Sequence, residues 1–178
     1  ANAAVTIDSA DTTIGSDITA NGKDAKVTAK NLSKLAGNVT TDADSSVELS
    51  FKEGAVWTGD NAGNTTMSLS KGSWNGANTG KLNATLTNGT AWTGDSSGAG
   101  STIKLDASTW NGANSGANAT INLTDSSWTG DNSGAGVTIT ADNSKWNGSA
   151  NAAGSAVLTN GSVWTGASTS GDFSLTLN

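Results

Sequence analysis

The stretch SSWTGDNSGAGVTITADNSKWNGSANAAG, residues 126–154, contains the phrase WTG and, eighteen residues later, the phrase WNG. Tryptophan recurs in this way through two thirds of the chain, at one interval of 17 residues and five of 18. A fixed period of this length is typical of a solenoid, in which each repeat forms one coil and contacts only its neighbours. The chain has seven tryptophans, which are Trp57, Trp74, Trp92, Trp110, Trp128, Trp146 and Trp164.

The residue after each tryptophan alternates between threonine and asparagine, and glycine always follows it. The repeating unit is therefore a pair of coils. Because these residues share one position in every coil, we interpret them as a candidate interaction wall. They are Thr58, Asn75, Thr93, Asn111, Thr129, Asn147 and Thr165.

A short alternation of apolar and polar residues precedes most of the tryptophans. Ile103 and Leu105 flank Lys104, for example, and Val137 and Ile139 flank Thr138. This period of two indicates a strand with one buried face, and the Gly, Asn, Asp and Ser residues between strands favour turns. The sequence thus predicts an all-β fold, a single-stranded parallel β-helix of nine or ten coils of roughly 18 residues, about 45 Å long.

The first third of the chain follows the pattern more loosely. VTID (5–8), KVTA (26–29) and VELSF (47–51) repeat at intervals of 22 and 20 residues. We interpret residues 1–46 as irregular coils with longer turns and residues 47–178 as regular coils, all within one β-helix domain, 1–178. Seven of the nine lysines lie between residues 23 and 81, so the lysine-rich surface belongs to the first half.

The tryptophans have two possible positions. Inside the solenoid, they would form an aromatic ladder that supplies bulk to a core poor in Leu, Ile and Phe, with the glycine two residues later leaving room for each ring. Outside, they would stack on sugar rings. We favour the interior, because seven exposed tryptophans in a row would form a large adhesive patch.

Composition excludes several functions. The net charge is −6 and every basic residue is lysine, which argues against binding to nucleic acid or to an anionic membrane surface. The absence of cysteine rules out disulfides and thiolate metal sites, and no stretch is long and apolar enough to span a membrane.

Asp60, Asp95 and Asp131 follow WTG in alternate coils, so their carboxylates would lie about 10 Å apart. No His, Arg, Tyr or Cys is present to act with them as a base, a clamp or a nucleophile. GDNAGN and GDNSGAG faintly resemble calcium turns but lack the GGxGxD pattern. We predict no enzyme activity, no catalytic or metal site and no cofactor.

LTNGTAWTG (86–94), LTNGSVWTG (158–166) and GDFSLTLN (171–178) resemble the passenger domains of bacterial autotransporters of the pertactin-like type. The resemblance covers residues 47–178 well and residues 1–46 loosely. It implies a right-handed parallel β-helix at the surface of a Gram-negative cell. It also implies that the chain is part of a longer passenger, with membrane attachment only through a C-terminal β-barrel outside this chain.

The function expected from these features is adhesion, with self-association, aggregation or biofilm formation through ladders on the walls of the β-helix. The expected partners are other copies of the chain, with host matrix or glycan as a further possibility. A passive stalk that presents a distal binding domain is the alternative, and a polysaccharide-active enzyme is a remote one.

Overall fold

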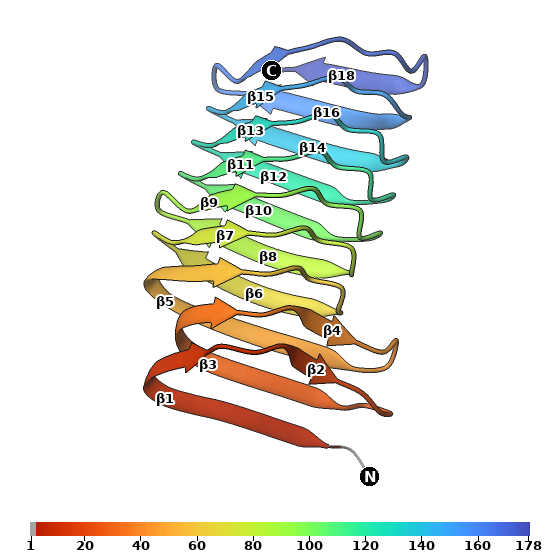
Figure 1. Ribbon diagram of the computed structural model, residues 1–178. Coiled ribbons are helices and arrows are strands. Elements are labelled where there is room, and N and C mark those ends of the chain that lie inside the picture. The colour runs from red at the N-terminus through yellow and green to blue at the C-terminus, as the bar shows by residue number, and fades with distance from the viewer. Residues whose placement is uncertain (1–2) are drawn as a thin grey trace.

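The chain forms a parallel β-solenoid of about ten turns of about 18 residues (Figure 1). The computed structural model describes residues 3–178, and within them it contains eighteen strands and no helix. All the strand pairs are parallel, and successive turns lie one above the other from the N-terminus to the C-terminus (Figure 1). The predicted all-β solenoid is confirmed.

One side of the solenoid, called here the long wall, is a sheet to which every turn contributes a strand. Its inward side chains are apolar: Ile103 pairs with Ile121 in the next turn and both are fully buried, whereas Lys104 between the apolar positions is exposed. The apolar alternation therefore marks strands, as predicted. The ten strands are β1 (Ala4–Ile14), β3 (Lys26–Ala36), β5 (Ser46–Thr58), β6 (Thr65–Ser70), β8 (Leu82–Thr87), β10 (Thr102–Asp106), β12 (Thr120–Thr124), β14 (Val137–Asp142), β16 (Gly154–Thr159) and β18 (Phe173–Leu177).

The second side, the Trp wall, consists of short strands centred on the tryptophans. Each ring pairs with the ring in the next turn, and the ends of β3 and β5 extend the wall toward the N-terminus. Its short strands are β7 (Ser73–Asn75), β9 (Ala91–Thr93), β11 (Thr109–Asn111), β13 (Ser127–Thr129), β15 (Lys145–Asn147) and β17 (Val163–Thr165).

A third side closes each turn. It begins with the paired strands β2 (Ile18–Ala20) and β4 (Val39–Thr41). From Val39 onward it continues as single bridging residues, one in each turn. These are Asn61, Asn78, Ser96, Asn114, Asn132, Ala150 and Ser168.

The first turns differ from the later ones as the sequence predicts. β1 and β3 pair at an offset of 22 residues, β3 and β5 pair at an offset of 20, and both pairings contain register shifts. β1, β3 and β5 are 11 to 13 residues long, and β3 and β5 bend from the long wall into the Trp wall without a break. In later turns a residue at positive φ, such as Asn88 or Asp125, separates the two walls.

The tryptophan rings lie inside the solenoid, where the core interpretation puts them. Trp57 to Trp146 are at most 1% exposed, and Trp164 in the last turn is half-buried. Neighbouring rings stack with centroids 4.4–5.1 Å apart and planes 3–10° from parallel. Full burial of about 200 Å² per ring contributes up to about 5 kcal/mol of hydrophobic free energy. One ring per turn is therefore a large share of the core.

Each indole also donates a hydrogen bond to backbone. Its Nε1–H bonds to the carbonyl of a glycine in the preceding turn at 2.7–3.0 Å, as in Trp110 to Gly94. The glycine two residues after each tryptophan does not leave room for the ring, as the sequence suggested. A Cβ on Gly112 would instead lie 2.0 Å from the carbonyl oxygen of Gly94. The glycine column is needed for close backbone stacking between turns.

Sequence reasoning missed a polar column inside the third side. Asn61, Asn78, Asn114 and Asn132, which look like turn residues in the sequence, are fully buried. Asn61 donates to Asn78 at 2.8 Å and Asn114 donates to Asn132 at 2.7 Å. The signal for this column is its position, four residues after each tryptophan.

Candidate functional site

The outer face of the Trp wall carries the predicted interaction residues in a single straight column, called here the Thr/Asn column. Because the strands pair in register, Asn111 lies beside Thr93 on one side and Thr129 on the other. All seven members are exposed, since each follows an inward-pointing tryptophan on a strand. The structure brings together Thr58, Asn75, Thr93, Asn111, Thr129, Asn147 and Thr165.

The side chains of the Thr/Asn column make no hydrogen bond to any other part of the chain that the structure describes. Exposed polar residues elsewhere bond from turn to turn. Asn88 donates to Ser70 at 3.0 Å, and Asn160 donates to the carboxylate of Asp142. The hydroxyl and amide groups of the column are thus free to bond to a partner or to water.

The Trp wall is also nearly free of charge. Beside the Thr/Asn column runs a second outward column, formed by the residue before each tryptophan, and its single charged member is Lys145. The other members are Val56, Ser73, Ala91, Thr109, Ser127 and Val163. The long wall, by contrast, exposes Glu48, Lys104 and Asp106.

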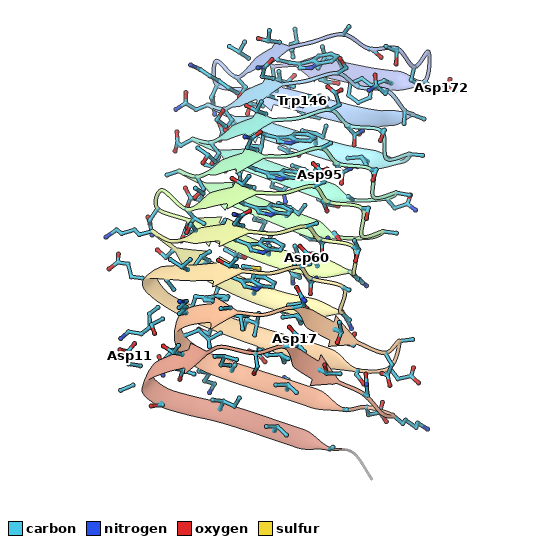
Figure 2. The ribbon with its side chains drawn as sticks, viewed as in Figure 1. Asp11, Asp17, Asp60, Asp95, Trp146 and Asp172 are labelled. Atoms are coloured by element: carbon cyan, nitrogen blue, oxygen red, sulfur yellow. The ribbon has the colours of Figure 1, made fainter. Side chains whose placement is uncertain are left out.

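Asp60, Asp95 and Asp131 lie at one edge of the Trp wall, two residues beyond the Thr/Asn column; Asp60 and Asp95 are labelled in Figure 2. Each carboxylate accepts a hydrogen bond from a backbone N–H in the next turn. The acceptor–donor distances are 2.8 Å for Asp60 to Ala77, 2.8 Å for Asp95 to Ala113 and 2.7 Å for Asp131 to Ser149. The alternation of WTGD with WNGA or WNGS therefore has a structural cause, because every second turn supplies the acceptor and the next supplies the donor.

The described residues contain no group of three His, Cys, Asp or Glu side chains that could hold a metal ion. The largest hollow, of about 380 Å³, is shallow and lies beside Asp42, Asn64 and Lys81. A second, of about 280 Å³, lies between Asp125, Asn143 and Lys145 at the corner of the long wall and the Trp wall. Neither hollow contains a pair of neighbouring carboxylates.

Two aspartates in the first turns have shifted acidities. A hydrogen bond from Ser33, together with Lys52, lowers the pKa of Asp11 below its usual 3.8. Hydrogen bonds from Ser45 and from the backbone of Gly22 lower the pKa of Asp42 in the same direction. Both groups are exposed and lie far along the chain from the Thr/Asn column, so these shifts concern stability of the first turns.

Comparison of the chain with protein-family models, curated proteins and solved structures gives no match. Among residues 3–178 no helix is long and apolar enough to cross a membrane. Functional inference therefore depends on the geometry of the walls.

Proposed function

We propose that this chain is a segment of a cell-surface adhesin that self-associates through the outer walls of its solenoid. The observation that carries the proposal is the Thr/Asn column, seven exposed side chains in register whose polar groups have no partner within residues 3–178. A straight row of identical weak donors and acceptors suits multivalent contact, because many small contributions add when the turns engage together.

The parallel β-solenoid is compatible with the passenger domain of a bacterial autotransporter. The sequence phrases that resemble those passengers support the same assignment. On this proposal the segment is displayed outside a Gram-negative cell, where it promotes aggregation or biofilm formation. Host matrix or glycan would be a secondary partner of the same polar walls.

A passive stalk is the second candidate. The observation that favours it is regularity: from Trp57 to Trp164 the turns stack with bends of constant length and no inserted loop. Such a segment could hold a distal domain away from the cell without contacts of its own. Adhesin and stalk make opposite predictions when the segment is removed and the spacing is restored.

The test is a cell-aggregation assay with a strain that displays the segment and one in which an unrelated solenoid of equal length replaces it. The adhesin proposal predicts that cells settle rapidly only with the native segment. Equal settling of both strains would favour the stalk.

A further inference from the structure

We propose that the two-turn alternation on the Trp wall sets the register in which two copies pair: antiparallel, with each Asn of the Thr/Asn column opposite a Thr of the partner. This inference rests on the proposed self-association and specifies its geometry. Antiparallel pairing is the arrangement available to solenoids that extend toward each other from two opposed surfaces. In it the Thr/Asn column of one copy faces the same column of the other.

The lengths of the side chains favour the mixed register. The wall is straight, because rings and strands stack evenly from turn to turn. Asparagine is longer than threonine, so Asn opposite Thr gives the same separation at every turn. Asn opposite Asn would alternate with Thr opposite Thr, and the wide and narrow pairs could not all be in contact. Both side chains donate and accept hydrogen bonds, so mixed pairs can also bond reciprocally.

The aspartates at the edge of the wall favour the same register. When Asn111 lies opposite Thr129, the turn of Asp131 faces the turn of Ala113, which carries no charge at that position. If the register shifts by one turn, so that Asn111 lies opposite its own copy, the turn of Asp95 faces the turn of Asp131. Because like charges placed opposite one another disfavour a register, the alternation of Asp with Ala or Ser selects against the shifted one.

The remaining charge on the wall fits this pairing. With Asn111 opposite Thr129, the turn of Lys145 faces the turn of Ala91. Ala91 is the smallest residue of its column and leaves space for the long lysine side chain.

The area of the wall makes the pair weak. Six turns at about 5 Å and a width of three residues at about 3.3 Å give a face of about 30 by 10 Å, or on the order of 300 Å² per copy. Stable complexes bury about 1,200–2,000 Å² in total. Two free copies should therefore stay monomeric at micromolar concentration, whereas many copies on each of two surfaces should bind through avidity.

Cross-linking between beads tests the register directly. The chain has no cysteine, so Asn111→Cys, Thr129→Cys and Thr138→Cys each introduce a single exposed thiol, the last on the long wall. Each variant is tethered by its C-terminus to a separate bead population, populations are mixed, and a short bis-maleimide is added after the beads clump. Near-UV circular dichroism of each free variant confirms that the tryptophan stack is intact.

The proposed register predicts that Asn111→Cys beads mixed with Thr129→Cys beads give several-fold more cross-linked dimer than either population alone, with Thr138→Cys at background. Equal yields from like and mixed pairs would overturn the register. Clumping with the highest yield from Thr138→Cys would also overturn it while leaving self-association standing. If the unmodified beads do not clump, self-association and the register both fail.

Discussion

The first turns and the later turns of this solenoid reach the same fold by different means. Up to β5 the core column is aliphatic, with Leu35 directly beneath Trp57, and long strands bend around the corner. From Trp57 onward stacked indoles fill the column. All four ion pairs among the described residues lie in the first part, joining Lys26 to Glu48, Lys30 to Asp8, Lys52 to Asp11 and Lys71 to Glu53.

The difference teaches how charge and aromatic packing divide along one solenoid. Exposed ion pairs contribute little each, and salt screens them. The later turns replace them with buried rings and backbone contacts, so their outer wall needs no charge for stability. A neutral wall is then available for contact with another copy.

The largest expected effect is at the centre of the stack. Trp110→Ala should lower the free energy of unfolding by about 3–5 kcal/mol, because it leaves a cavity between two rings and frees the carbonyl of Gly94. Leu35→Ala, at the equivalent place in the irregular turns, removes a smaller side chain and should cost less. Urea unfolding followed by far-UV circular dichroism measures both. A larger loss from Leu35→Ala would contradict the role given to the stack.

Gly112→Ala should rank second. The new Cβ would lie 2.0 Å from the carbonyl oxygen of Gly94, and relieving this overlap should cost about 1–3 kcal/mol. Gly15→Ala in the irregular turns is the matched control, because its Cβ meets nothing within 4 Å and its φ lies outside the left-handed region. We expect Gly15→Ala to be neutral or slightly stabilising. Similar thermal midpoints for the two variants would argue against close backbone stacking.

The buried asparagine column should show a smaller effect. Asn61→Ala removes bonds to Asn78, Gly63 and the hydroxyl of Thr65, and should cost about 1–2 kcal/mol. Ala150 occupies the same column naturally, so the substitution fits sterically. Asn132→Ala, which has fewer partners, should be milder in the same denaturation experiment. Equal costs would mean that burial rather than bonding sets the requirement at this position.

The smallest effect concerns pH and separates the two regions. Asp11 and Asp42 have lowered pKa values, so their contribution to stability is present above the usual aspartate pKa of 3.8 and is lost as the pH falls through the lower folded values. Below pH 3.8 we therefore expect the first turns to loosen before the tryptophan stack. Hydrogen exchange, read separately for residues 4–56 and 57–164, checks the order. Simultaneous loss of protection in both regions would contradict it.

Much of the fold could be predicted from the sequence because its signals are periodic. The tryptophan spacing gives the turn, and pairs such as Ile103 and Leu105 give the strands and their buried face. The Thr/Asn column follows from the same periodicity, since a residue next to an inward ring on a strand must point outward.

The other columns could not be predicted, because Gly and Asn have the same meaning in a turn and in a close stack when read from one sequence. Gly112 looks like a turn residue, yet its role is set by a carbonyl eighteen residues earlier. Asn114 likewise looks exposed until Asn132 is placed above it. The hydrogen bond from Ala113 to Asp95 explains the two-turn alternation, but only coordinates show that these groups meet.

The most direct test of the account is to charge the Trp wall and measure aggregation. A variant with Thr93→Lys, Asn111→Lys and Thr129→Lys should fold normally, because all three side chains are exposed and unbonded. The matched control carries Thr85→Lys, Thr138→Lys and Thr140→Lys on the long wall, which already exposes Lys104. We predict that beads or cells bearing the Trp-wall variant fail to aggregate while the control aggregates as the unmodified chain does. Full aggregation of the Trp-wall variant would contradict the central claim.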